Sequence, residues 1–246
     1  MLRDVIFYTF GLKSLWLENC LKNFFYCFHN ELGHKQQKAL INYLKKMELY
    51  YKKRPTDFFK ILYDKQKNYW SYLWINLYNN TNLFKIWGLI NKGNYPRLEL
   101  LIFLIKVAKF HNKSVDSGLN SLISTFEYTS IGKELKIGIV TRENNKRFVK
   151  KEGGYFFDLY VILYALYKFA YKNNVFSIDI EGIENELYSP QKILVIESSN
   201  VKTALFEINE SELLQTDIED DRLITKLNYI THPYDVLKKC IQKEQL

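Results

Sequence analysis

The segment between residues 57 and 92 constrains the fold most strongly, because it concentrates large apolar side chains. It holds three of the four tryptophans, Trp70, Trp74 and Trp87. Trp70, Trp74 and Leu77 recur at helical spacing, which predicts a helix in the hydrophobic centre of the protein. An aromatic platform for single-stranded nucleic acid is the alternative. Such platforms alternate aromatic residues with Lys and Arg, and this run does not, so we favour a core.

The composition predicts a globular protein that folds without disulfides or structural metals. The chain has 246 residues, 47% of them hydrophobic, which allows one large domain or two to three lobes. Three cysteines, Cys20, Cys27 and Cys240, are odd in number and unevenly placed, which argues against a disulfide framework and for a reducing compartment. Cys20, Cys27, His29 and His34 lack the paired spacing of zinc ligands, so we predict no metal and no cofactor.

Two apolar runs are too short to cross a membrane. They are Leu98–Ile105 and Phe156–Tyr167, which end at Lys106 and Lys168. No charged and then apolar leader opens the chain. We therefore expect a cytoplasmic protein with no membrane partner.

A helix-turn-helix is predicted near the start of the chain. Residues 12–28 carry a broad apolar stripe, and Gly33 then offers the left-handed conformation that a tight turn needs. Residues 34–48 predict an amphipathic helix with a basic face, and the second helix of such a pair enters the major groove of DNA. Its apolar positions are Ala39, Leu40, Tyr43, Leu44 and Met47, and Lys52, Lys53 and Arg54 follow it before Pro55.

A winged-helix order is predicted further along the chain. Leu98–Phe110 and Val115–Phe126 are expected to be helices, with Ser114 as the N-cap of the second. Glu134–Val140 and Arg147–Val149 alternate like two strands around residues 143–145. The hairpin region carries seven cations that suit phosphate contacts, although a solvated charged hairpin is the alternative. These cations are Lys133, Lys136, Arg142, Lys146, Arg147, Lys150 and Lys151.

Charge is divided unevenly along the chain. Residues 1–154 hold 26 Lys and Arg against 12 Asp and Glu, a balance of +14, whereas residues 155–246 hold 9 against 15, a balance of −6. An AT-rich genome could explain the many lysines of the chain. It would not explain why basic residues are few and acidic residues frequent in residues 155–246. The split predicts a polyanion-binding region, residues 1–154, and an acidic α+β lobe with another task, residues 155–246.

The acidic lobe is expected to mix helices and strands. A buried helix is predicted over Phe157–Tyr171 and a short acidic helix over Asp179–Leu187. Strands are predicted at Ile193–Glu197, at Ala204–Ile208 and near Ile224–Ile230, with a last helix from Tyr234. The acidic run over residues 210–221 is a solvated surface or, alternatively, a face that docks a protein.

The order of several short motifs resembles a bacterial family known as domain of unknown function number four thousand and seven. Its members are typically encoded beside DNA phosphorothioate-modification genes and related phage-defence cassettes. The resemblance covers nearly the whole chain and implies a role in DNA modification or defence through DNA or partner binding. The resembling residues are Thr9-Phe10, Trp16-Leu17, Leu32-Gly33, Ile41-Asn42-Tyr43-Leu44, Leu73-Trp74-Ile75-Asn76-Leu77-Tyr78, Ile86-Trp87, Leu187-Tyr188-Ser189-Pro190 and Pro233-Tyr234-Asp235-Val236-Leu237.

The chain departs from this family at its start. The family usually has a His-Glu pair before the Thr-Phe, where this chain has Phe7-Tyr8. Whatever that pair does in the family is therefore not assigned to this protein.

No motif in the sequence indicates catalysis. The chain lacks a P-loop, a paired-glycine dinucleotide motif and a nucleophile elbow. A metal-dependent nuclease is the alternative, with carboxylates and a lysine at strand ends. Its candidate residues would be Glu197, Lys202 and Glu207 with Asp179 or Glu181, but they contain no clean Glu-x-Lys pair.

We therefore predict a mainly α protein with small β-hairpins (α+β), built from tandem winged-helix or helix-turn-helix-like modules. Its predicted function is non-catalytic binding of double-stranded DNA in a bacterial DNA-modification or anti-phage system. A protein-binding adaptor or scaffold subunit, docked through the acidic lobe, is the alternative. The residues predicted to bind DNA are Lys35, Lys38, Asn42, Lys45, Lys46, Lys52, Lys53, Arg54, Lys133, Lys136, Arg142, Lys146, Arg147, Lys150 and Lys151.

Overall fold

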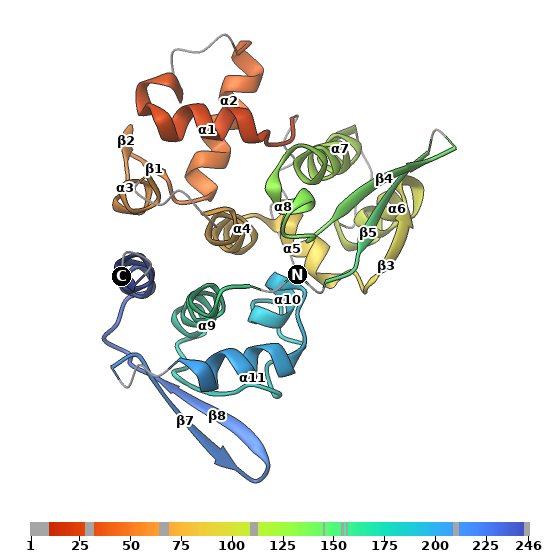
Figure 1. The fold of residues 1–246 in the computed structure, drawn as a ribbon. Coiled ribbons are helices and arrows are strands. Elements are labelled where there is room, and N and C mark those ends of the chain that lie inside the picture. The colour runs from red at the N-terminus through yellow and green to blue at the C-terminus, as the bar shows by residue number, and fades with distance from the viewer. Residues whose placement is uncertain are drawn as a thin grey trace. The chain divides into compact units, whose positions relative to one another are not determined.

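The chain forms two compact units, Met1–Gly153 (unit 1) and Gly154–Leu246 (unit 2), shown in Figure 1. The computed structural model describes residues 10–27, 32–63, 69–108, 113–144, 146–153, 155, 157–208 and 212–243. The predicted lobe boundary at residue 154 lies one residue from the division. The predicted mixture of helices and small antiparallel sheets is confirmed. No helix in the described residues is long and apolar enough to cross a membrane.

Unit 1 consists mainly of helices, with two short sheets. Its elements are α1 (Ser14–Lys22), the 3-10 helix η1 (Phe24–Cys27), α2 (His34–Lys46), β1 (Tyr50–Tyr51), β2 (Arg54–Pro55), α3 (Asp57–Tyr63), α4 (Tyr69–Asn80), α5 (Asn82–Leu89), β3 (Gly93–Pro96), α6 (Arg97–Ala108), α7 (Lys113–Tyr128), α8 (Ser130–Lys133), β4 (Ile139–Glu143) and β5 (Lys146–Lys151).

Unit 2 places one three-stranded sheet among helices. Its elements are α9 (Leu159–Asn173), β6 (Ser177–Asp179), α10 (Pro190–Leu194), α11 (Ser198–Glu207), β7 (Leu214–Glu219), β8 (Arg222–Leu227) and α12 (Pro233–Lys243). The phenol of Tyr167 on α9 donates to the carbonyl of Leu213 at 2.6 Å, which ties α9 to the start of β7. Burial raises the pKa of Tyr167 to about 12.

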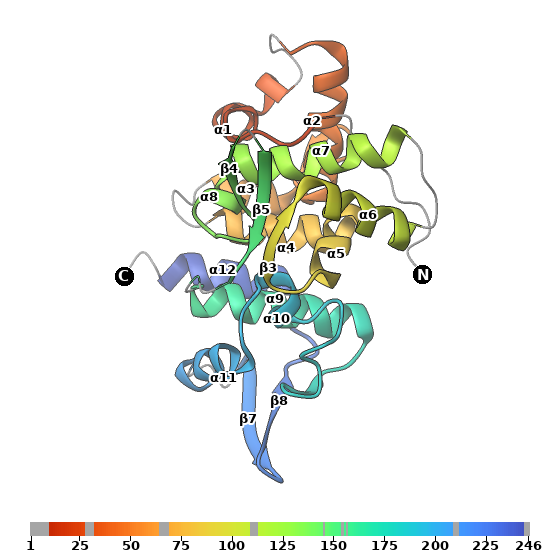
Figure 2. The same cartoon turned by 90° about the vertical axis from the view of Figure 1, so that its right-hand side faces the viewer.

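One order of elements occurs in both units. In unit 1, α5, β3 and the helices α6, α7 and α8 precede the β4–β5 hairpin, and the sheet order is β3-β5-β4. Figure 2 shows these three strands side by side with β5 in the middle. In unit 2, α9, β6, α10 and α11 precede the β7–β8 hairpin, and the sheet order is β6-β8-β7. In each unit the strand before the helices pairs with the second strand of the hairpin.

The tryptophan segment forms the core of unit 1, as the sequence predicted. Trp74, Trp87 and Phe126 are each at most 1% exposed. The Phe126 ring lies 5.1 Å from the Trp87 ring and 6.1 Å from the Trp74 ring, centroid to centroid. The Trp87 indole also donates to the carbonyl of Ile137 at 2.9 Å. A Cβ at Gly138 would overlap the Phe126 ring, so the chain approaches the cluster closely there.

The start of unit 1 differs from the predicted helix-turn-helix. The first helix ends at Lys22 instead of residue 28, and η1 follows. The Cα atoms of Cys20 and Cys27 lie 4.9 Å apart and the two residues form a disulfide, contrary to the prediction of no disulfide framework. Gly33 has a φ of −59°, so it does not form the predicted left-handed turn. The connection from Asn23 to Gly33 is longer than the three to four residues of a helix-turn-helix turn.

Two further predictions in unit 1 are wrong in their bounds. The predicted strand over residues 134–140 begins at Ile139, because α8 and a turn precede it. Ser114 lies inside α7, which begins at Lys113, so it is not the predicted N-cap. The connection around residues 143–145 is confirmed, since Glu143 pairs directly with Lys146.

Three predictions in unit 2 are also wrong. The predicted helix over residues 179–187 is the end of β6 followed by turns. The predicted strand over residues 193–197 is the end of α10 and the connection to α11, and the one over residues 204–208 falls mainly in α11. Val201, Ala204 and Leu205 are spaced as one helix face and are all buried, which outweighs their strand propensity. The acidic run contributes β7, a strand that the sequence analysis missed.

We predict that Phe126→Ala lowers the free energy of unfolding of unit 1 by about 3–5 kcal/mol, because it leaves a cavity between two tryptophans. Urea unfolding followed by tryptophan fluorescence reports on this unit, since all four tryptophans lie between residues 16 and 87. Tyr229→Ala, which truncates an exposed ring of unit 2, is the control and should leave the value unchanged. A loss below about 1 kcal/mol for Phe126→Ala would contradict the central role of this cluster.

Candidate nucleic-acid interface

Helix α2 presents a basic face because four of its apolar residues turn inward. Ala39, Leu40, Tyr43 and Leu44 are buried. On the remaining positions Lys35, Lys38 and Lys45 are exposed, and Asn42 and Lys46 are half-buried. Spacings of three, four and three residues place Lys35, Lys38, Asn42 and Lys45 along one line of the helix.

Helix α4 fixes the end of α2 from which the basic hairpin starts. The side-chain amide of Asn76 donates to the carbonyl of Met47 at 3.3 Å, and that of Asn80 donates to the carbonyl of Lys46 at 3.0 Å. Asn80 also donates to the Glu48 carboxylate at 2.8 Å. The carbonyls at a helix C-terminus have no partner within the helix, so these bonds satisfy groups that burial would otherwise leave unpaired.

The β1–β2 hairpin continues the basic face with two adjacent lysines. Tyr51 pairs with Arg54, so Lys52 and Lys53 alone form the turn, with φ values of 45° and 64°. Two left-handed residues match the twist of a hairpin, although Asn and Gly are the usual residues there. The turn holds Lys52 and Lys53 exposed at the tip, with Arg54 exposed beside them.

We call one set the helix–hairpin cations: Lys35, Lys38, Lys45, Lys46, Lys52, Lys53 and Arg54. No carboxylate of the described residues forms an ion pair with any of them. Aromatic rings lie close to two of them, since the Lys45 ammonium is 6.0 Å from the Tyr50 ring and the Lys52 ammonium 5.3 Å from the Tyr51 ring. The set is therefore an unneutralised positive surface.

The cations of the β4–β5 region are partly neutralised. Arg142 and Arg147 lie opposite each other on the two strands, at 2.7 Å and 3.6 Å from the carboxylate of Glu127 on α7. The hydrogen bond and charge of Glu127 raise the pKa of Arg142. Lys150 lies 2.8 Å from Glu152, and this hydrogen bond lowers the pKa of the Glu152 carboxyl. Lys133, Lys136 and Lys146 are exposed.

Sequence reasoning missed the role of Glu127. This residue follows the predicted end of its helix, and nothing in the local pattern relates it to a hairpin some fifteen residues later. Only the packing of α7 against β4 brings its carboxylate to the two arginines.

Lys151 is not available to a phosphate, which corrects its predicted DNA-binding role. Its side chain is buried, and its ammonium donates to the carbonyls of Trp87 at 2.8 Å, Gly88 at 3.3 Å and Ile90 at 2.6 Å. These carbonyls lie at the C-terminus of α5, where a positive charge is stabilised by the helix dipole. Lys151 is a structural cap for α5.

The predicted DNA-binding residues do not all lie together. In Figure 1 the β1–β2 hairpin lies at the left edge of unit 1, and the tip of the β4–β5 hairpin lies at the right edge. The structure thus brings α2 and the β1–β2 hairpin into one surface and places the β4–β5 cations apart from it.

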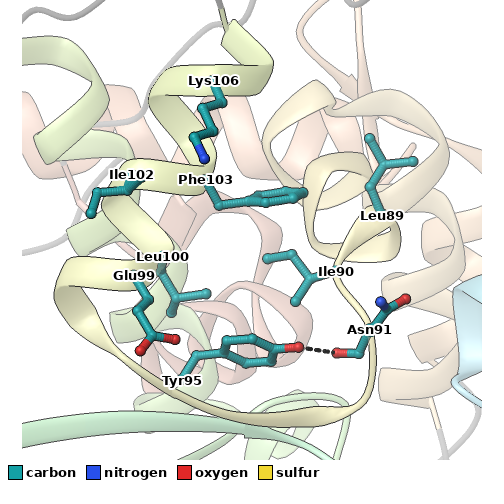
Figure 3. Close-up of a pocket in the computed structure, with 9 residues that line it drawn as sticks. All are labelled: Leu89, Ile90, Asn91, Tyr95, Glu99, Leu100, Ile102, Phe103 and Lys106. Carbon is teal, nitrogen blue, oxygen red and sulfur yellow. Dashed lines mark hydrogen bonds between the residues drawn. The ribbon is translucent and has the colours of Figure 1, made fainter.

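A surface pocket of about 340 Å³ lies between the α5–β3 connection and α6 (Figure 3). Leu89, Ile90, Leu100, Ile102 and Phe103 supply most of its lining. Polar groups are fewer. The Tyr95 phenol donates to the carbonyl of Asn91 at 2.9 Å, and Glu99 and Lys106 lie two turns apart on α6. This pocket brings together no group of side chains suited to acid–base or metal chemistry.

The residues of the nuclease alternative do not meet at strand ends. Glu197 and Glu207 lie at opposite ends of α11, which separates their Cα atoms by about 15 Å. Lys202 forms an ion pair with Glu181, and Arg222 lies 3.0 Å from Asp179. Across the residues described, no three His, Cys, Asp or Glu side chains gather into a possible metal site. Phe7, Tyr8, Thr9 and His29 lie outside the described residues.

Comparison with known proteins shows a likeness of fold. No protein-family model matches the chain, and no curated protein matches its sequence. The fold is similar to two solved structures, described as "SspB crystal structure" and "Magnesium ion-bound SspB crystal structure". Their TM-scores are 0.71 and 0.70, and in both the match covers 96% of this chain and 86% of the other at 13% identity.

We predict that Lys151→Met lowers the free energy of unfolding of unit 1 by about 2–3 kcal/mol, because three buried carbonyls lose their donor. The neighbouring Lys150→Met is the matched control, since Lys150 is exposed and its removal should cost less than about 0.5 kcal/mol. Urea unfolding followed by tryptophan fluorescence measures both. Equal losses for the two variants would contradict the assignment of Lys151 as a cap.

Proposed function

We propose that this protein is a non-catalytic subunit that binds duplex DNA through the helix–hairpin cations. The observation that carries the proposal is the surface of unpaired cations on α2 and the β1–β2 hairpin. Lysines placed this way neutralise phosphates and release counterions, which supplies affinity without reading sequence. Arg, which recognises guanine better, contributes one of the seven cations, so the proposal is of binding with little base specificity.

We further propose that the repeated order of elements represents tandem winged-helix modules. In this assignment α7 and α11 would be the second helices of their pairs, and α2 the corresponding helix of a shorter first module. Helix α7 is poorly suited to a groove. Its exposed side chains within the described residues are Asn120 and Tyr128 and include no cation, and its Ser121 hydroxyl lies 2.8 Å from the Tyr43 phenol of α2. We therefore assign α2 to the groove.

The system that this subunit serves is proposed from two resemblances. The motif order resembles a family found beside DNA phosphorothioate-modification and phage-defence genes. The fold likeness to SspB supports the assignment of this chain's architecture. Together they support a place in a bacterial DNA-modification or anti-phage system.

We expect duplex affinity to fall with salt at a log–log slope of about −5 to −7, and Lys52→Gln/Lys53→Gln to reduce the magnitude of this slope by about 2. The reason is the loss of two phosphate contacts. Fluorescence anisotropy of a labelled duplex at several salt concentrations measures the slope, and an unlabelled duplex of unrelated sequence should compete equally.

Lys92→Gln/Lys106→Gln is the matched control, because it removes two exposed charges of unit 1 away from α2 and the β1–β2 hairpin. Its slope should equal that of the wild type. A flat slope for the wild type, or equal slopes for the Lys52/Lys53 variant and the wild type, would refute the proposed surface.

A second proposed function is protein docking through the β7–β8 hairpin. Its turn consists of Asp220 and Asp221, both exposed and left-handed with φ values of 49° and 61°. The Lys226 ammonium forms ion pairs with the carboxylates of Asp217 at 3.2 Å and Glu219 at 3.8 Å. No basic side chain within the described residues forms an ion pair with Asp220 or Asp221 at the tip. This tip suits a basic protein partner.

We expect Asp220→Asn/Asp221→Asn to abolish assembly with the proteins encoded by neighbouring genes while leaving the salt slope for duplex DNA unchanged. Asn is chosen because it tolerates the left-handed conformation and removes only the charge. Co-purification of tagged protein with those gene products measures assembly, and the Lys52/Lys53 variant serves as the control. Normal assembly of the Asn variant would exclude this docking surface.

A further inference from the structure

A hollow of about 480 Å³ opens in unit 1 between η1, the end of the β1–β2 hairpin and α3. Three phenylalanines, Phe24, Phe25 and Phe59, line it together with Pro55. Lys22 and Lys60, both exposed, stand at its rim. Pro55 directly follows Arg54, so the hollow adjoins the helix–hairpin cations.

Two of the three aromatic rings are fixed by packing. Phe59 is buried, and the Phe24 ring stands edge-on to it with centroids 5.2 Å apart and an interplanar angle of 79°. Phe24 also packs at 6.0 Å from the Tyr50 ring of β1. The floor of the hollow is therefore preorganised by contacts that join η1 to the hairpin and to α3.

Phe25 is held in an unusual position for an apolar side chain. It is 73% exposed, yet the Asn23 carboxamide oxygen accepts a hydrogen bond from its main-chain N–H at 3.0 Å. The disulfide between Cys20 and Cys27 joins the two ends of the segment that carries it. Phe25 thus presents an open phenyl ring at the edge of the hollow.

Exposed aromatic rings flanked by cations are typical of sites for unpaired bases, because every base has a face that can stack. Bases inside a duplex already stack on each other and cannot offer that face. Lys60 lies 2.9 Å from Asp57, but this exposed ion pair contributes little and can exchange for a phosphate. Lys22 forms no ion pair with the described residues.

We propose that this hollow binds an unpaired nucleobase of a single-stranded DNA segment, with the base stacked on Phe25 and the flanking phosphates on Lys22 and Lys60. The inference rests on the proposed DNA-binding function and deepens it by naming the form of DNA. The helix–hairpin cations would hold the adjoining backbone, and the hollow would receive a base wherever the strand is unpaired.

The test uses the full chain and an oligonucleotide of about twelve nucleotides with one 2-aminopurine, as a single strand and as a duplex. We expect the single strand to bind with quenching of 2-aminopurine fluorescence, the sign of stacking. Phe25→Ala should weaken single-strand binding about tenfold and abolish the quenching, with duplex affinity unchanged. Because Phe25 is largely exposed, the substitution should not impair folding.

Three control variants make the test more specific. Phe25→Trp keeps an aromatic face and should retain the quenching, whereas Phe25→Leu keeps apolar bulk and should lose it. Leu15→Ala, which truncates an exposed apolar side chain of α1 outside the hollow, should change nothing. Full binding and quenching with Phe25→Leu would overturn the stacking site and favour an apolar peptide as the occupant.

The two proposals fail in different ways. The single-strand site is overturned if the duplex binds with salt dependence but the single strand shows no 2-aminopurine quenching. It is also overturned if Phe25→Ala weakens binding of the single strand and of the duplex equally. Either result leaves the proposed function unaffected. Absence of binding to either form overturns the proposed function itself.

Discussion

The complete burial of α4 is the constraint on which the rest of unit 1 depends. Residues 70–79 of this helix are all buried, which requires neighbours on every side. Among its polar residues, Asn76 and Asn80 both donate to carbonyls at the end of α2. The same helix therefore fills the core and fixes the end of α2 from which the basic hairpin starts.

The hairpins of the protein combine left-handed turn geometry with turn residues of different charge. Two of the described hairpins are closed by a pair of left-handed residues, Lys52-Lys53 and Asp220-Asp221, and Asn144 at the β4–β5 connection is also left-handed. The turn geometry determines which residues lie at the tip, and the identity of those residues determines the charge of the tip. In the proposed function, the cationic tip of the β1–β2 hairpin would contact a polyanion and the acidic tip of the β7–β8 hairpin a basic partner.

Local patterns predicted the elements whose periodicity was strong. The apolar spacing of Trp70, Trp74 and Leu77 located α4, and that of Leu40, Tyr43 and Leu44 located the inward face of α2. Local patterns gave a wrong prediction where tertiary packing outweighed strand propensity. In α11, β-branched and apolar residues predicted a strand, but the segment is helical. Local patterns also failed at Gly33, because a glycine permits a left-handed turn without requiring one.

The sequence by itself determined the helices with the strongest apolar periodicity, such as α2 and α4, where the charge changes sign, and that the tryptophan segment is buried, since each follows from local spacing and composition. Only the tertiary structure decided which cations remain unpaired. Lys150 and Lys151 are neighbours in the chain, yet one is exposed and the other is buried as a cap on α5. Glu127 reaches Arg142 and Arg147 only through packing. Electrostatic neutralisation depends on distances in space, and local sequence does not encode them.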